Sequence, residues 1–177
     1  PETQLLATHG YAVLQVNFRG SSGRGEAFKR MGYRQWSGAM QDDVADATMQ
    51  LIGAGIVDPK RVCIAGGSFG AYSAMISSIR YPTLYKCAIG YSGVYRLESL
   101  FKTGDVSNQA SSRRYMDMVI GRDEASLAHE SPSSRATELK QPVLLIHGES
   151  DRRTPPEHAQ ALRKALEAAG NPPEWLM

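Results

Sequence analysis

The chain has 177 residues, of which 42% are hydrophobic and 21% charged, and its formal net charge is +2. This composition is typical of one soluble globular domain that needs neither a metal nor a disulfide to fold. The 20 basic and 18 acidic residues are interspersed, so nothing in the sequence requires nucleic acid as a partner. No apolar run reaches the length of a membrane span and the N-terminus lacks a signal peptide, so we expect no membrane association and favour a cytoplasmic location.

Four short apolar runs rich in Val and Ile predict strands at 11–18, 61–67, 86–93 and 141–148. Their nearly continuous apolar character is typical of parallel strands that are covered on both faces. Helices are predicted at 39–55 and 68–81, each between two of these strands, and at 155–170, after the last strand. The first of these helices has an apolar stripe, formed by Met40, Val44, Ala47, Leu51 and Ile52.

This alternation of strands and helices predicts an α/β fold with a doubly wound, mostly parallel sheet. Residues 94–140 depart from the pattern, and we interpret them as an insertion at the rim of the sheet. Short helices are expected there near 95–102 and 111–120, followed by a polar loop at 128–136.

The two cysteines, Cys63 and Cys87, each lie in an apolar strand-like run. We therefore expect two buried free thiols rather than a disulfide or a metal site, and assign them no chemistry.

Gly66, Ser68 and Gly70 form a G-x-S-x-G pattern directly after a predicted strand and directly before a predicted helix. In this context the pattern indicates a nucleophile elbow, a strained turn in which small neighbours such as Gly67 leave room for the backbone. Ser68 would be the nucleophile, and the backbone N–H of Phe69 would stabilise an oxyanion. The alternative is a glycine-rich turn in which Ser68 only caps the helix.

Asp151 follows the predicted strand at 141–148, at the edge of the sheet where ligands bind in open α/β folds. A carboxylate there can orient an imidazole, which is the third role in a Ser-His-Asp triad. The order of serine before acid is the order of the α/β-hydrolases.

Three segments together resemble the catalytic domain of the prolyl oligopeptidase family of serine peptidases, and in particular its acylaminoacyl-peptidase and dipeptidyl-peptidase branches. They are "NFRGSSGRGEAF" at 17–28, "DPKRVCIAGGSFGAY" at 58–72 and "HGESDRRTPPEHA" at 147–159. The resemblance implies an α/β-hydrolase fold, Ser68 as nucleophile, Asp151 as acid, and a peptide or acyl-peptide substrate. It implies no metal ion and no organic cofactor.

Two small departures from the family pattern are Ala71, where a glycine is usual, and Thr154, where a valine is usual. A larger one is that no residue matches the catalytic histidine, which in the family lies in a loop beyond the acid. The preceding strand, its oxyanion loop and the family's β-propeller are not matched either. We therefore expect residues 1–177 to be a partial hydrolase domain, incomplete at both ends and inactive by itself, with exposed sheet edges that favour self-association.

Of the four histidines, His147 is the least implausible substitute base, although it is better interpreted as a structural partner of the turn before Asp151. His158 is expected on a helix without a catalytic role, and His9 and His129 are expected at the surface without a specific function.

Several arginines have both a functional and a structural interpretation. "RGSSGRG" at 19–25 is interpreted as a structural loop, although Arg19 and Arg24 could reach the cleft. Four others could recognise a substrate carboxylate but are expected on solvated surface: Arg113, Arg114, Arg152 and Arg153. Three functions remain open: a serine peptidase, an esterase with the same machinery, and an inactive module that acts only in assembly.

Overall fold

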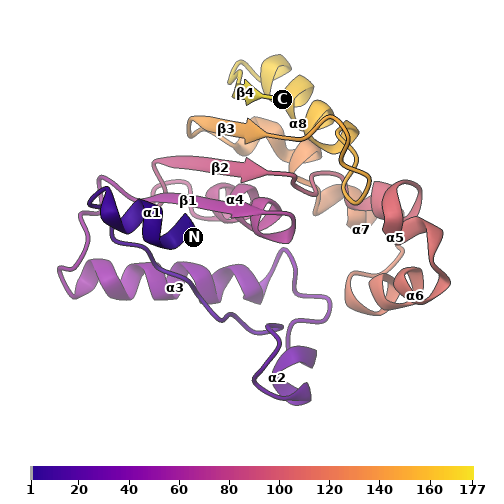
Figure 1. Ribbon diagram of the computed structural model, residues 1–177, viewed down its shortest axis with the longest axis horizontal. Coiled ribbons are helices and arrows are strands. Elements are labelled where there is room, and N and C mark those ends of the chain that lie inside the picture. The colour runs from indigo at the N-terminus through magenta and orange to yellow at the C-terminus, as the bar shows by residue number, and fades with distance from the viewer. Residues whose placement is uncertain (1) are drawn as a thin grey trace.

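The computed structural model describes residues 2–177, whose core is a four-stranded parallel sheet (Figure 1). The strands lie side by side in the order β1 (Cys63–Gly67), β2 (Cys87–Tyr91), β3 (Val143–Ile146) and β4 (Glu174–Leu176). Gly67 pairs with Tyr91, and Tyr91 pairs with Ile146, so the first three strands end together at one edge. The strands predicted at 61–67, 86–93 and 141–148 are confirmed.

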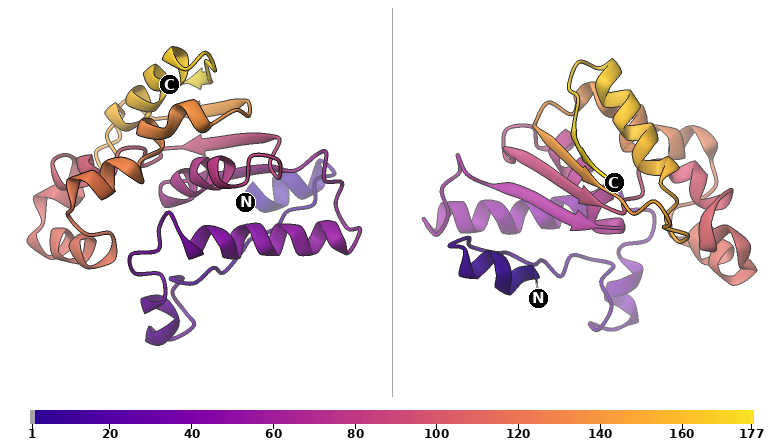
Figure 2. Two further views of the ribbon diagram at one scale, coloured as in Figure 1. Left: turned by 180° about the vertical axis from the view of Figure 1, so that it is seen from behind. Right: turned by 45° about the horizontal axis from the view of Figure 1, so that its top comes forward.

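The longer helices are α3 (Ala39–Gly53), α4 (Phe69–Arg80), α6 (Ala110–Val119) and α8 (Glu157–Ala168). The shorter ones are α1 (Glu2–Thr8), α2 (Glu26–Arg30), α5 (Gly104–Asn108), α7 (Glu124–His129) and the 3-10 helices η1 (Leu97–Phe101) and η2 (Pro132–Glu138). Seen from behind, α4 and α8 lie in front of the sheet, α3 lies below them beside the β1 edge and packs on α4, and α1 lies on the far side (Figure 2). None of the helices in residues 2–177 combines the length and the apolar character that a membrane span requires.

Helix α4 lies at the centre of the core, since every residue from 71 to 79 is buried. Its neighbour α3 begins at the predicted residue 39 but ends at Gly53 rather than at 55. Its buried residues share Met40 with the predicted apolar stripe but otherwise differ from it: Met40, Gln41, Ala45 and Thr48. The buried Gln41 joins the two helices, because its Oε1 accepts hydrogen bonds from the hydroxyls of Ser73 (2.5 Å) and Ser77 (2.9 Å). A hydrogen-bonded cluster of Gln41, Ser73 and Ser77 therefore replaces part of the expected apolar contact between α3 and α4.

The segment 94–140 contains more helix than the sequence predicts. The helices expected near 95–102 and 111–120 correspond to η1 and α6. The polar loop expected at 128–136 is instead occupied by the end of α7 and by η2. Local capping explains this difference, because the Asp123 carboxylate accepts the Ser126 amide at the start of α7, and Pro132 begins η2.

The strand predicted at 11–18 is wrong. These residues pair with no strand in the described part of the chain, and their large apolar side chains Tyr11, Val13 and Leu14 are exposed. Apolar content alone does not make a strand, since a strand also needs a neighbour to accept and donate its backbone hydrogen bonds.

The expectation of two free buried thiols is also wrong, because Cys63 and Cys87 form a disulfide. The two residues start β1 and β2 and face each other in register, with Cα atoms 4.7 Å apart. Adjacent strands at this spacing bring paired cysteines within bonding reach. Cys63 is exposed and Cys87 half-buried, so the disulfide lies at the surface of the sheet.

Reduction of this disulfide is expected to lower the free energy of unfolding by about 3 kcal/mol, because the bond closes a loop between residues 24 apart in sequence. Urea unfolding with and without a reductant measures the difference. A variant with Cys63→Ser and Cys87→Ser should match the reduced chain and be insensitive to the reductant. Equal midpoints for the oxidised and reduced parent chain would contradict the prediction.

Candidate active site

The turn between β1 and α4 consists of Ser68 alone. Its backbone has a φ of 53° and a ψ of −117°, a conformation that is strained for any residue with a side chain. The Ser68 amide donates to the Tyr91 carbonyl (3.0 Å), while its own carbonyl accepts from the amides of Ala71 and Tyr72 (3.1 and 3.2 Å). The backbone of Ser68 is thus fixed from both sides, and the residue is exposed at the edge of the sheet.

The Ser68 side chain does not cap α4, although Ser68 occupies the N-cap position. The alternative in which this serine only caps a helix therefore loses its support. A strained residue with an exposed hydroxyl and no capping bond is the geometry expected of a nucleophile elbow.

Gly66 permits the close approach of β1 and α4 at this turn, and Gly67 lies against the Tyr91 ring of β2. A Cβ on Gly66 would lie 2.5 Å from the carbonyl carbon of Gly70, and a Cβ on Gly67 would lie 2.1 Å from the ring of Tyr91. A Cβ on Gly70 itself would meet nothing within 4 Å. Gly66 is therefore required by the backbone of α4, whereas a side chain at Gly67 would have to displace the Tyr91 ring, and Gly70 matters as the backbone that Gly66 contacts.

Phe69 begins α4, and an amide in the first turn of a helix has no acceptor within the helix. It is thus free to bind negative charge beside Ser68, where the helix dipole also favours an anion. The Phe69 ring is held by aromatic neighbours, with centroids 4.7 Å from Trp36, 5.5 Å from Phe18 and 5.9 Å from Tyr72. These contacts fix the first turn of α4.

Asp151 lies in the loop that follows β3. Its Oδ1 accepts the amides of Arg153 and Thr154, both at 2.9 Å. The nearby Ser92 side chain also favours the ionised carboxylate. Burial opposes ionisation of Asp151, but these hydrogen bonds outweigh it and lower its pKa below the usual value. The carboxylate is therefore ionised at neutral pH.

The end of β2 connects the two loops. The Tyr91 carbonyl accepts the Ser68 amide, and the side chain of the next residue, Ser92, helps to lower the pKa of Asp151. The sequence-predicted nucleophile and acid thus lie at one edge of the sheet, and each interacts with one of two consecutive residues at the end of β2. Sequence reasoning missed Tyr91 and Ser92, whose only signal is their place at the end of a predicted strand.

His147 is buried and bonded within the acid loop. Its Nε2 lies 2.7 Å from the Thr154 carbonyl oxygen and 3.7 Å from Asp151 Oδ2. These contacts agree with its interpretation as a structural partner of the turn. Among the hydrogen bonds of residues 2–177, none joins His147 to the Ser68 hydroxyl.

The other histidines are bonded elsewhere in the fold. His158 is buried, and its Nδ1 accepts the amides of Tyr95 and Arg96, both at 3.3 Å. His9 Nδ1 lies 2.8 Å from the Leu5 carbonyl oxygen, and His129 is exposed at the end of α7. Among the hydrogen bonds of residues 2–177, the partners of His9, His147 and His158 are thus backbone groups and none is the Ser68 hydroxyl.

Burial lowers the pKa of His158 to about 4, against an ordinary value of 6.5, and the neighbouring His147 adds to the shift. Below pH 6.5 the unfolded chain therefore takes up a proton that the folded chain excludes, so stability is lost as the pH falls from about 6.5 to about 4. The full loss is expected to be about 3 kcal/mol. Urea unfolding at several pH values between 4 and 6.5 measures this loss. His158→Asn keeps an acceptor near the position of Nδ1 and should make the free energy of unfolding depend less on pH. An unchanged pH dependence in that variant would show that His158 is not the cause of the loss.

Arg19 is committed to structure. Its backbone N–H and its Nε both donate to Asp43 Oδ2 at 2.8 Å, and its Nη2 donates to Oδ1 at 2.6 Å. The bidentate pair ties the loop at 19–25 to the N-terminal half of α3 and lowers the pKa of Asp43. Arg24 packs over the Phe28 ring, 6.0 Å from its centroid. These contacts support a structural loop at 19–25, and Arg152 and Arg153 are exposed beside Asp151.

Metal ligation finds no support in this part of the chain: within residues 2–177, no three His, Cys, Asp or Glu side chains come together as a metal site would require. The groups that lie at this edge of the sheet are the Ser68 hydroxyl, the Phe69 backbone amide and the Asp151 carboxylate. This set matches two members of an acyl-transfer triad and one oxyanion donor.

Comparison with known proteins gives consistent matches over the whole chain. The sequence profile of the prolyl oligopeptidase family matches residues 1–177. Dipeptidyl aminopeptidase BIII of Pseudoxanthomonas mexicana is 32% identical over 179 residues, which cover 98% of this chain and 26% of that protein. The chain therefore spans about a quarter of the length of this relative.

Solved structures show the same fold. A puromycin-hydrolyzing peptidase of Mycobacterium tuberculosis is 29% identical with a TM-score of 0.83, and the match covers 91% of this chain and 24% of the peptidase. An acylaminoacyl peptidase of Pyrococcus horikoshii is 24% identical with a TM-score of 0.88, and the match covers 99% of this chain and 28% of that one. The predicted α/β-hydrolase fold is confirmed.

Proposed function

The chain belongs to the prolyl oligopeptidase family, and from this premise we propose that it supplies the nucleophile and the acid of a serine peptidase that hydrolyses short peptides or acyl-peptides. The observation that carries the proposal is the strained, uncapped Ser68 between β1 and α4. Peptidases similar to the chain include the dipeptidyl aminopeptidase and the puromycin-hydrolyzing peptidase.

In the proposed reaction Ser68 Oγ attacks the scissile carbonyl carbon, and a histidine takes the hydroxyl proton. The carbonyl oxygen becomes an oxyanion, which the Phe69 N–H stabilises. The histidine then returns the proton to the leaving amine, and water hydrolyses the acyl-enzyme by the same steps. Asp151, ionised at neutral pH, orients the histidine and stabilises its cation.

We further propose that this histidine is not one of the four in the 177 residues. His147 and His158 are buried and engaged with backbone groups, and burial keeps His158 neutral at physiological pH. Without a base the Ser68 hydroxyl keeps its proton, so the chain alone should retain only the ~10³- to 10⁴-fold catalysis over water that survives the loss of a triad member.

Added imidazole offers a direct test, since it can replace a missing general base. We expect imidazole to accelerate turnover of both an N-acyl-peptide anilide and the matched nitrophenyl ester by the 177-residue chain, after the rate of the protein-free reaction at the same imidazole concentration is subtracted, and Ser68→Ala to abolish this protein-dependent acceleration of both. Acceleration of the ester alone, with no anilide cleavage, would favour an esterase. A chain that circular dichroism shows to be folded but that hydrolyses neither substrate would contradict the proposal.

A further inference from the structure

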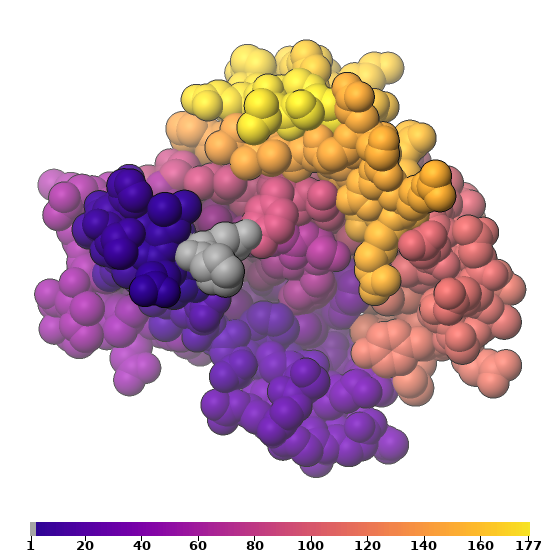
Figure 3. Space-filling model, viewed as in Figure 1, coloured from indigo at the N-terminus to yellow at the C-terminus, as the bar shows by residue number. Residues whose placement is uncertain are grey.

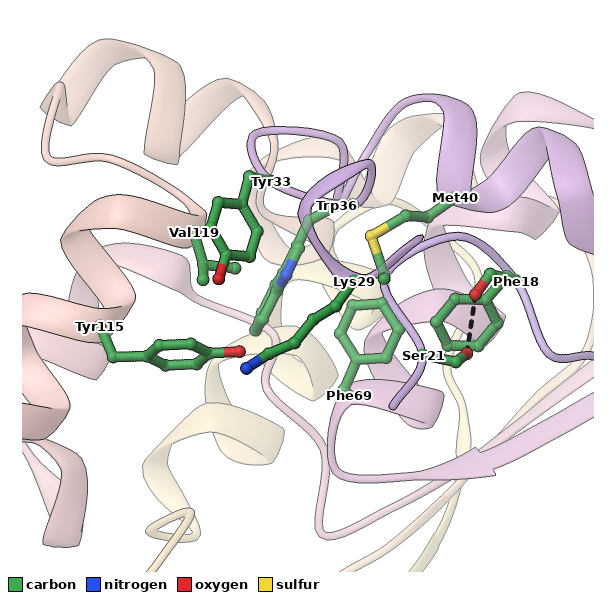
Figure 4. Close-up of a pocket in the computed structure, with 11 residues that line it drawn as sticks. Phe18, Ser21, Lys29, Tyr33, Trp36, Met40, Phe69, Tyr115 and Val119 are labelled. Carbon is green, nitrogen blue, oxygen red and sulfur yellow. Dashed lines mark hydrogen bonds between the residues drawn. The ribbon is translucent and has the colours of Figure 1, made fainter. Parts of the chain in front are cut away.

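A cavity of about 230 Å³ opens beside the proposed nucleophile (Figure 4). Three parts of the chain form its walls: residues 18–40, which include α2 and the start of α3; the first turn of α4; and helix α6. Its walls are mostly aromatic, and the side chains that decide its character are Phe18, Lys29, Tyr33, Trp36, Phe69 and Tyr115. Figure 3 shows that the surface recedes between the N-terminal part of the chain, in indigo and violet, and the C-terminal part, in orange and yellow.

The size of the cavity suits one side chain. Pockets for drug-sized ligands measure roughly 300 to 1,000 Å³, so about 230 Å³ is too small for several residues of a peptide. The wall is preorganised, because the Phe69 ring packs edge-on to Trp36 at 4.7 Å and tilted against Phe18 at 5.5 Å. Phe69 is also the residue after Ser68, so a side chain in the cavity belongs to a substrate residue close to the scissile bond.

Lys29 gives this apolar cavity a positive charge. Figure 4 shows its side chain crossing the cavity toward the Tyr115 hydroxyl, and its Nζ lies 5.6 Å from the Tyr115 ring centroid. Among the described residues that line the cavity, it is the one with a charged side chain at neutral pH.

The ammonium group is only loosely paired. Its carboxylate neighbour, Glu26, lies 3.9 Å away, is 57% exposed, and also receives the Arg30 guanidinium at 3.1 Å. An exposed pair at this distance contributes little, so a substrate carboxylate can compete for Lys29.

We propose that this cavity binds the C-terminal residue of a short peptide, with its aromatic or large apolar side chain against the wall that Phe18, Trp36 and Phe69 form and its free carboxylate on Lys29. The inference rests on the proposed peptidase function and names a substrate class for it. The aromatic walls and the Lys29 ammonium group disfavour a basic side chain, and the single cation favours a free carboxylate over an amide.

Tryptophan fluorescence can measure this binding, because the chain has two tryptophans and Trp36 lines the cavity. A Trp175→Phe background leaves Trp36 as the only reporter. The probes are N-acetyl-phenylalanine, its amide, and N-acetyl-alanine. We expect the phenylalanine acid to bind about fivefold more tightly than the amide, as one partly exposed ion pair allows, and the alanine acid to bind more weakly than both.

Charge variants separate the role of Lys29 from general effects. Lys29→Met should remove the preference for the acid over the amide, Lys29→Arg should keep it, and Glu26→Gln should strengthen it. Arg30→Met is the matched control, because Arg30 also pairs with Glu26 but does not line the cavity. It frees Glu26 to pair with Lys29, so it should weaken the preference for the acid slightly and far less than Lys29→Met does.

Equal affinity for acid and amide, an unchanged preference in Lys29→Met, or no binding of either phenylalanine probe to the folded chain would each overturn the inference. Binding does not require acylation, so Ser68→Ala should bind the probes as the parent does. Normal binding without any reactivity at Ser68 would instead indicate that only the proposed peptidase function is wrong.

Discussion

Replacing Asp151 with asparagine is expected to slow the imidazole-dependent acylation of Ser68 by roughly 10²-fold. A neutral amide cannot stabilise the imidazolium that forms as Ser68 loses its proton, and loss of this charge in an intact triad costs about 10⁴-fold. Asparagine keeps an Oδ1 acceptor for the amides of Arg153 and Thr154, so the loop should keep its shape. The measurement is the rate of fluorophosphonate labelling as a function of imidazole concentration.

Ser68→Ala serves as the blank in this experiment, and the imidazole-independent rate should be nearly the same in the parent and in Asp151→Asn. If the parent reacts rapidly and imidazole has no effect, a base is already present among the residues of the chain. His147, 3.7 Å from Asp151 Oδ2, would then be the first candidate, and the proposal of an external histidine would be wrong.

Gly66→Ala is expected to lower the free energy of unfolding by about 3 kcal/mol, because its methyl group would lie 2.5 Å from the Gly70 carbonyl carbon. Backbone atoms of a strand and a helix cannot give way as the end of a flexible side chain can. Relief of the clash must therefore move the β1–α4 turn and Ser68 with it, so acylation of Ser68 should fall together with stability. Urea unfolding and labelling of the same samples measure both effects.

Gly70→Ala is the matched control for this substitution. A Cβ on Gly70 meets nothing within 4 Å, and alanine favours a helix over glycine, so stability should change by about 1 kcal/mol or less, or increase. If Gly66→Ala is as stable as Gly70→Ala, the close approach of β1 and α4 is not what requires glycine at the elbow.

The sequence predicts the elements whose signals are local. Helix α4 is predicted from its apolar content and the proline after it, and Ser68 is found because a short motif joins a strand to a helix. The segment at 11–18 has an equally strong apolar signal but lacks a described partner strand. Its failure as a strand shows that pairing, unlike apolar content, depends on what lies beside a segment.

Features that depend on register or on distant pairing were not predictable in this way. The disulfide requires β1 and β2 to align Cys63 with Cys87, which neither run specifies alone. Likewise, Arg19 begins the glycine-rich loop at 19–25, but its partner Asp43 is on α3, 24 residues away. The loop sequence alone does not identify this partner. Gln41 was assigned no place in the core because its partners, Ser73 and Ser77, are on another helix.

Peptide mapping of the 177-residue chain after exposure to a fluorophosphonate in the presence of imidazole tests most directly whether Ser68 is the nucleophile. We expect a single adduct, located on the peptide that contains Ser68 and absent from Ser68→Ala. A folded chain that carries its adduct on another residue, or carries none at any imidazole concentration, would contradict the assignment of Ser68 as the nucleophile of a serine peptidase.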